Sequence, residues 1–224
     1  MNIFSMDSML GRVLYWIADI FILNILWIIF SLPIFTIGAS TTALYYSMMQ
    51  RQRRDESYIH KNFIKAFKEN FKQSTILWLI MILVALVLFA DLRIGLFFNI
   101  NQNLLIGKIF IVVSVILMIP YLFVLLYIFP IQAKFENTIK DNLKNAILMA
   151  IGHLGYTLLL LMIVATFVVL TLFSRAFIGV EILFGVGLYA YLTSNVYITI
   201  FRKHLPDELE EDLEAIGYKH KRDR

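Results

Sequence analysis

The fold is decided by residues 13–54, which read VLYWIADIFILNILWIIFSLPIFTIGASTTALYYSMMQRQRR. The apolar part, Val13–Met49, carries one charged residue, Asp19. As a single helix it would be about 55 Å long at 1.5 Å per residue, whereas a membrane's hydrocarbon core is about 30 Å thick. Pro33 and Gly38 are residue types that interrupt helices. We therefore expect two helical pieces here rather than one.

The first piece, Val13–Leu32, is long enough to cross a membrane. The second, Ala39–Arg54, is long enough for a half-helix and marginal for a full crossing. Four further apolar runs have the length of membrane spans: Ile76–Ala90, Leu104–Phe129, Ile147–Phe173 and Ile182–Phe201. The sequence thus predicts an all-α, polytopic membrane helix bundle with about five transmembrane helices and a half-helix. Six spans is the alternative.

The composition supports this class. Of the 224 residues, 60% are hydrophobic and 16% are charged, whereas soluble domains have roughly 45–50% apolar and about 25% charged residues. The absence of cysteine excludes disulfides and thiolate metal sites. No zinc-protease motif, phosphate-binding glycine loop or nucleophile elbow is present. We predict no catalytic, cofactor or metal site, and hence no enzyme.

The positive charges predict the orientation. Most of the 20 Lys and Arg residues lie in three segments: Arg51–Lys72, residues 130–146 and the chain after Phe201. Cytoplasmic loops carry such an excess, so these segments and the C-terminus are expected in the cytoplasm. The predicted domains are a transmembrane part, residues 1–204, and a short cytoplasmic tail, residues 205–224. Charges placed this way indicate a membrane surface and no nucleic-acid partner.

Two of the basic segments also carry apolar residues at every fourth position, which makes one apolar stripe on a helix. We expect two amphipathic cytoplasmic helices whose stripes lie on the inner leaflet or against a partner protein. The stripe residues are Phe63, Phe67 and Phe71 in the first segment, and Phe135, Ile139 and Leu143 in the second.

The two segments resemble each other. Residues 68–74 read KENFKQS and residues 140–146 read KDNLKNA, at a constant offset of 72. Each is followed by a hydrophobic run. The pattern indicates an internal duplication of residues 57–90 and 131–170. Chance similarity between two basic amphipathic helices is the alternative.

Polar groups at membrane depth are the candidate ligand or helix-break site, because such groups are costly there. Asp19 is read as a substrate or proton group, or as an interfacial one, and Asn24 as an interhelical hydrogen-bond partner. The hydroxyls after the break either bind a ligand at the positive end of a half-helix or simply cap it. The full set is Asp19, Asn24, Pro33, Thr36, Gly38, Ser40, Thr41 and Thr42.

Four parts of the chain carry a family resemblance: residues 24–27 (NILW), residues 32–46 (LPIFTIGASTTALYY), residues 63–71 (FIKAFKENF), and the later Pro130, Phe135 and residues 143–146 (LKNA). They resemble the YesL-like integral membrane proteins of Gram-positive bacteria, a domain of unknown function. The resemblance implies a multi-pass protein of the bacterial cytoplasmic membrane. Members are often encoded beside carbohydrate ABC importers, sugar-binding proteins and sensor kinases.

Two functions follow as expectations. The first is a non-enzymatic accessory protein for carbohydrate uptake or sensing, whose partners are the lipid bilayer and a carbohydrate ABC permease or a sensor histidine kinase. The alternative is a small-solute transporter in its own right, with Thr36–Thr42 at its site.

Overall fold

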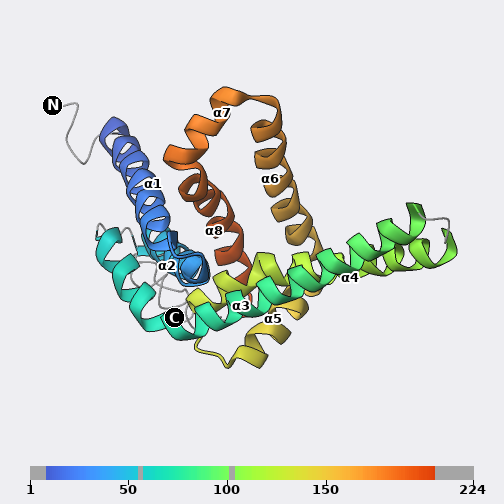
Figure 1. The fold of residues 1–224 in the computed structure, drawn as a ribbon. Coiled ribbons are helices and arrows are strands. Elements are labelled where there is room, and N and C mark those ends of the chain that lie inside the picture. The colour runs from blue at the N-terminus through green and yellow to red at the C-terminus, as the bar shows by residue number, and fades with distance from the viewer. Residues whose placement is uncertain (1–8, 55–57, 101–103, 205–224) are drawn as a thin grey trace.

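The computed structural model describes residues 9–54, 58–100 and 104–204, and within these ranges the chain forms helices and no strand (Figure 1). Five helical stretches are long and apolar enough to cross a membrane: Val13–Ser31, Ile59–Phe98, Leu104–Lys134, Leu154–Phe173 and Phe177–Arg202. The predicted all-α, polytopic class is therefore confirmed. The predicted tail, residues 205–224, lies outside the described residues.

The chain breaks after the first span, as predicted at Pro33. Helix α1 (Met9–Ser31) is followed by extended backbone at Pro33, a short 3-10 turn η1 (Ile34–Thr36) and helix α2 (Ile37–Arg54). The hydroxyl of Thr36 lies 2.6 Å from the carbonyl oxygens of both Phe30 and Pro33. That contact ties the end of α1 to the turn.

The prediction that Gly38 interrupts the helix was wrong. Gly38 lies in the first turn of α2, where a Cβ atom would stand 2.5 Å from the carbonyl oxygen of Ser74 and 2.6 Å from Cβ of Trp78. Glycine is required because the α2 and α3 backbones approach closely here, and not because the helix ends. Helix α2 is mostly buried, and it packs against α1, α3, α4 and α8.

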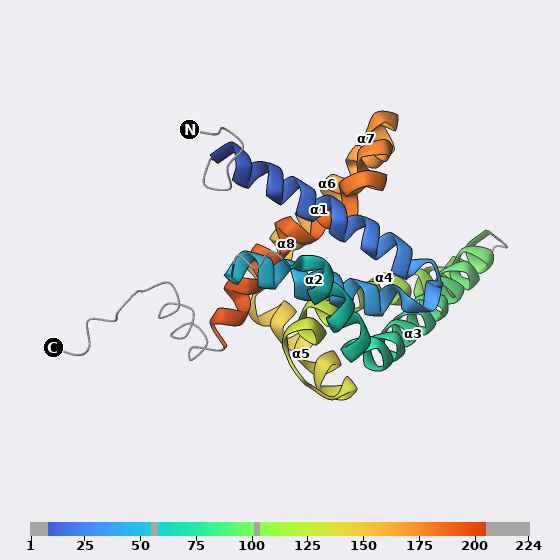
Figure 2. The same ribbon diagram turned by 90° about the vertical axis from the view of Figure 1, so that its left-hand side faces the viewer.

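The first amphipathic segment is not a separate helix. It is the beginning of α3 (Ile59–Ile100), a continuous helix of 42 residues, which is about 63 Å at 1.5 Å per residue. Helix α4 (Leu104–Lys134) runs back beside it, and the two form a long hairpin (Figures 1 and 2). Near its tip, Asp91 accepts a hydrogen bond from Ser114 at 2.5 Å.

The second amphipathic segment is interrupted where one helix was predicted. Residues 131–134 form the last turn of α4, residues 135–138 are not helical, and α5 begins at Ile139 and ends at Gly152. The reason is a local cap. Thr138 has extended backbone, and its hydroxyl accepts a hydrogen bond from the backbone N–H of Asp141 at 3.2 Å. Threonine in this position starts a helix.

The remaining chain forms a second arm. Helix α6 (Leu154–Phe173) leads to α7 (Arg175–Val180), a π-helical turn η2 (Glu181–Gly185) and α8 (Val186–Arg202). Both ribbon views show this arm and the α3/α4 hairpin extending in different directions from a base that contains α2 and α5 (Figures 1 and 2).

Polar side chains join the helices inside the base. Buried hydroxyl pairs link α2 to α3, α2 to α8 and α4 to α6: Thr42 with Ser74 at 2.9 Å, Tyr45 with Thr193 at 3.2 Å, and Tyr127 with Thr157 at 2.9 Å. Hydrogen bonds between helices are a usual source of association in membranes, where apolar side chains gain little by leaving lipid. The base is therefore held by specific contacts as well as by packing.

Candidate functional site

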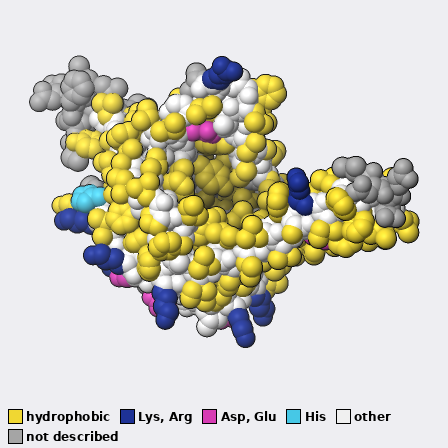
Figure 3. All heavy atoms as spheres, in the orientation of Figure 1, with side chains coloured by type: hydrophobic (Ala, Val, Ile, Leu, Met, Phe, Trp, Pro, Cys, Tyr) yellow, Lys and Arg dark blue, Asp and Glu magenta, His cyan; other side chains and the backbone are white. Residues whose placement is uncertain are grey.

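A cavity of about 550 Å³ lies between the two arms, above α2. Figure 3 shows it as a hollow with yellow, hydrophobic walls, open on the side facing the viewer. Its walls come from α2, α3, α4, α6, η2 and α8. The lining residues are Ile37, Thr41, Tyr45, Trp78, Leu122, Leu125, Leu126, Phe129, Pro130, Leu161, Val164, Phe167, Val168, Glu181, Gly185, Val186 and Tyr189.

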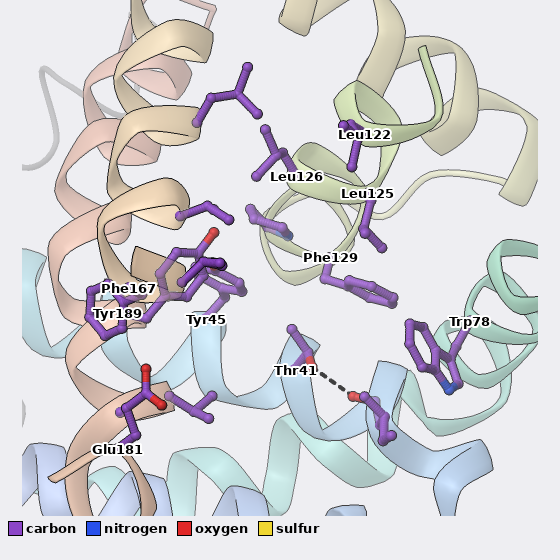
Figure 4. A pocket seen from close by; sticks show the side chains of 17 residues that line it. Thr41, Tyr45, Trp78, Leu122, Leu125, Leu126, Phe129, Phe167, Glu181 and Tyr189 are labelled. Atoms are coloured by element: carbon purple, nitrogen blue, oxygen red, sulfur yellow. Dashed lines mark hydrogen bonds between the residues drawn. The ribbon is translucent and has the colours of Figure 1, made fainter. Parts of the chain in front are cut away.

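The few polar groups of this cavity are bonded to the protein. Thr41 accepts a hydrogen bond from the indole N–H of Trp27 at 3.1 Å and donates to the carbonyl oxygen of Ile37 at 2.7 Å, the dashed line in Figure 4. The Tyr45 hydroxyl pairs with Thr193. Among the described residues that line the cavity, Glu181 alone is charged. The site is thus an apolar chamber with a single carboxylate at its edge.

Glu181 begins the π-helical turn η2. Its Oε1 atom accepts a hydrogen bond from the hydroxyl of Thr171 on α6, at 2.6 Å. This bond connects the two helices of the second arm across the α7 turn. Single π-helical turns inside helices are frequent at functional sites because they change the direction of side chains.

Asn24 holds that turn in place. Its Nδ2 donates to the carbonyl oxygen of Ile182 at 2.9 Å, and its Oδ1 accepts from the backbone N–H groups of Val186, at 3.0 Å, and Gly187, at 3.2 Å. Backbone groups that a π-helical turn leaves without their usual partners must be satisfied elsewhere in a membrane. The predicted role of Asn24 as an interhelical hydrogen-bond partner is confirmed.

Asp19 meets a cation that the sequence analysis missed. Its Oδ2 lies 2.6 Å from Nε of Arg51, and the guanidinium of Arg51 stands 4.5 Å from the ring centre of Trp16. The side chains of Arg51 and Asp19 are 8% and 13% exposed. In the sequence, Arg51 is one of the basic residues that predict the orientation, and nothing near it points to Asp19. The break at Pro33 could have predicted this ion pair. The chain turns back there, and Asp19 on α1 and Arg51 on α2 lie at similar distances along the chain from the turn.

The hydroxyls of the Thr36–Thr42 segment do not form one group. Thr36 closes the turn, Thr42 pairs with Ser74, and Ser40 is fully buried. Only Thr41 lines the cavity. This arrangement matches a capped and packed helix start more closely than an assembled ligand site.

The apolar stripes face inward. Phe63 is 0% exposed, Phe67, Phe135, Ile139 and Leu143 pack against the core, and Phe71 is 38% exposed. The predicted partner surface is therefore not presented by these side chains, Phe71 excepted. The first stripe is covered by α1: the ring of Phe30 lies 5.5 Å from that of Phe63 and 4.8 Å from that of Phe67, centre to centre.

The opposite side of the same helical segment is the exposed one. Lys61, Lys65, Lys68 and Lys72, which we call the basic face, are all exposed and follow one another at helical spacing. Figure 3 shows Lys and Arg side chains along the lower left and the bottom of the molecule, where α3 begins and α5 lies. Among the described residues, no group of three or more His, Asp or Glu side chains could hold a metal ion.

The comparisons support the family assignment. Residues 20–92 match the family model "Protein of unknown function, DUF624". The chain is 28% identical over 204 residues to the "Uncharacterized protein YesL" of Bacillus subtilis (strain 168), covering 89% of this chain and 93% of that protein. It is 28% identical over 205 residues to the "Uncharacterized protein YteU" of the same organism, covering 88% of each. No solved structure matches. The chain is therefore similar to the YesL-like proteins over most of its length.

Proposed function

We propose that this YesL-like protein is a non-enzymatic accessory subunit for carbohydrate uptake or sensing in the bacterial cytoplasmic membrane. Its partner is a carbohydrate ABC permease or a sensor histidine kinase. The observation that carries the proposal is the basic face, Lys61, Lys65, Lys68 and Lys72. A row of exposed cations on a rigid helix continuous with a span offers an acidic cytoplasmic surface a fixed binding partner.

The proposal requires the basic face to lie in the cytoplasm, together with α5 and the chain after Phe201. The bias of Lys and Arg toward cytoplasmic loops supports that orientation. The far ends of the two arms carry few basic residues, among them Arg93, Lys108 and Arg175. These ends would then lie toward the outside.

The cavity gives little support to transport of a sugar. Sugar hydroxyls removed from water need hydrogen-bond partners, but the walls are apolar and Thr41 and Tyr45 are already bonded to protein groups. Transport by the chain alone is the alternative. Proteoliposomes that contain only this protein test it, and accumulation of a labelled sugar would favour the transporter.

Co-purification tests the accessory role. The chain is expressed with a carbohydrate ABC permease and, separately, with a sensor histidine kinase from the same organism, and isolated in a mild neutral detergent. Replacing all four lysines of the basic face by Glu is expected to lower partner recovery at least about tenfold, since each reversed charge repels an acidic partner.

The matched control is the double variant Arg93→Glu and Lys108→Glu, which reverses exposed charges on the α3/α4 hairpin away from the basic face. It should leave recovery unchanged. If neither partner is recovered with the unaltered chain, or if both variants lose the partner equally, the proposal is wrong.

A further inference from the structure

We propose that the cavity between the arms is a binding site for one long-chain cationic amphiphile, with the alkyl chain against the apolar walls and the ammonium group at Glu181. The inference concerns a different part of the molecule from the basic face. It stands whether or not the chain is an accessory subunit.

Size and lining select an alkyl chain. The volume, about 550 Å³, falls within the range of roughly 300–1,000 Å³ that ligand pockets occupy. The opposing walls carry Leu122 and Leu126 on α4, with Val164 and Phe167 on α6. The hollow is open along one side (Figure 3). Since the walls from α3, α4, α6 and α8 belong to helices that can span a membrane, an amphiphile can enter the cavity laterally from the bilayer.

Charge selects the head group. Glu181 is the one charged residue among the described lining residues, so no cation is present there to accept an anionic head group. A carboxylate beside apolar walls attracts an ammonium ion strongly because the local dielectric constant is low. For the same reason it repels a second carboxylate or a phosphate.

Glu181 lies at the edge of the cavity, and its carboxylate can accept hydrogen bonds beyond the one from Thr171. A carboxylate has two oxygens with about four acceptor sites, and the bond from Thr171 uses Oε1. The backbone beneath it is fixed by the three hydrogen bonds of Asn24. Figure 4 shows Glu181 at one edge of the cavity, on the side of Tyr189 and Tyr45. A bound ammonium would complete the hydrogen bonding of this carboxylate without displacing Thr171.

Trp78 provides the measurement, because it lines the cavity. A dodecyl amine, a dodecyl alcohol and a dodecanoate, each brominated on the terminal carbon, are titrated into the protein in a neutral detergent, and quenching of tryptophan fluorescence is recorded. The same titrations on Trp78→Phe give the signal that does not come from the cavity. The difference reports binding beside Trp78.

We expect the amine to bind the unaltered protein at least about tenfold more tightly than the alcohol, and the carboxylate to bind least well, since charge-assisted bonds are about twice as strong as neutral ones. In Glu181→Gln the amine and the alcohol should bind equally. Glu69→Gln, which removes an exposed carboxylate of α3, should keep the preference.

Two results would overturn the proposal: equal binding of amine and alcohol to the unaltered protein, or a preference for the amine that survives in Glu181→Gln. A further variant keeps the proposal testable if Glu181→Gln fails to fold. Val164→Phe narrows the cavity without adding a fluorophore and keeps Glu181, and it should strongly reduce the Trp78-dependent quenching by all three probes. Undiminished quenching in that variant would show that the probes bind elsewhere.

Discussion

Two stretches of this chain have nearly the same sequence pattern and different structures. In residues 59–90 the amphipathic part and the membrane span are one unbroken helix, the first three-quarters of α3. In residues 131–170 the chain leaves the helix at residues 135–138 and turns again at His153, between α5 and α6. The pattern of apolar and basic residues therefore predicts which face of a helix is buried, but not whether the helix continues.

The cap at Thr138 accounts for the interruption at residues 135–138, and the surroundings account for the turn at His153. The first part of α3 is held from outside by α1 and α2, with Gly38 allowing close contact at Ser74. At the α5–α6 corner, a Cβ atom placed on Gly152 or Gly155 would meet nothing within 4 Å. A helix braced along its length stays straight, whereas one with an open side can bend at a glycine.

The two stretches nevertheless meet at one residue. Gln132 donates a hydrogen bond to Asn70 at 2.9 Å and accepts one from Asn142, and these two asparagines are the matching residues of the two sequence copies. A duplicated unit would place equivalent side chains in this way. The duplication itself stays a prediction.

The largest expected difference between the stretches concerns their matching phenylalanines, Phe63 and Phe135. Phe63→Ala should lower the free energy of unfolding by about 3–5 kcal/mol, the usual cost of removing a fully buried ring. Phe135→Ala should cost about 1–2 kcal/mol, because Phe135 is only half-buried and less area is lost. Thermal unfolding in detergent measures both. Equal losses would mean that the two stripes are packed alike.

The next largest difference in stability is expected between leucine substitutions at two glycines, Gly38 at the α2–α3 contact and Gly155 at the open α5–α6 corner. Gly38→Leu should destabilise the protein by about 1–3 kcal/mol or more, since overpacking forces backbone shifts and the obstructing atom, the Ser74 oxygen, belongs to the backbone. Gly155→Leu, at an exposed position of α6, should stay within about 0.5 kcal/mol. A tolerated leucine at Gly38 would contradict the close α2–α3 contact.

Removing Asn142, the buried hydrogen-bond partner of Gln132, should destabilise the protein more than removing Asn70, its half-buried partner. Asn142→Ala leaves the buried side-chain oxygen of Gln132 without its donor, at a cost of about 1–3 kcal/mol. Asn70→Ala should cost about 0.5–1.5 kcal/mol, because Asn70 is only partly buried. Chemical or thermal unfolding of the two variants tests the order. The reverse order would exclude the geometry described for Gln132.

These comparisons show what the sequence could predict. The span count follows from the length of the apolar runs, and the break at Pro33 follows from the geometry of proline. The hydrogen bonding of Asn24 to another helix follows from the cost of an unpaired amide in a membrane. The partner of Asp19, the role of Gly38 and the packing of Phe63 against Phe30 of α1 do not. Each depends on which helix lies opposite, and no local pattern in α1, α2 or α3 carries that information.

The cavity could not be predicted from the sequence either, because it depends on which helices lie opposite one another. Its walls come from segments as distant as Thr41 and Tyr189, and Glu181 directly precedes the apolar run Ile182–Phe201. The one available signal was a lone carboxylate next to a long apolar run. Such residues at membrane depth are functional candidates.

The smallest expected effect is a pH dependence at the open corner. Burial lowers the pKa of His153, and the neighbouring His204 and Lys203 lower it further. The folded state thus disfavours the protonated imidazole, so stability is full above the pKa of unfolded histidine, about 6.5, and falls as the pH drops through that value. The melting temperature should decline slightly below that pH, and His153→Gln should flatten the decline. An unchanged slope would place the effect on other groups.

Orientation is the premise of the proposed function, and cysteine labelling tests it most directly because the chain has no cysteine of its own. Lys68→Cys lies on the basic face and Lys108→Cys on the α3/α4 hairpin. With a membrane-impermeant maleimide on intact cells, we expect Lys108→Cys to be labelled and Lys68→Cys to be labelled only after permeabilisation. Labelling of Lys68→Cys in intact cells would put the basic face outside and exclude a cytoplasmic partner there.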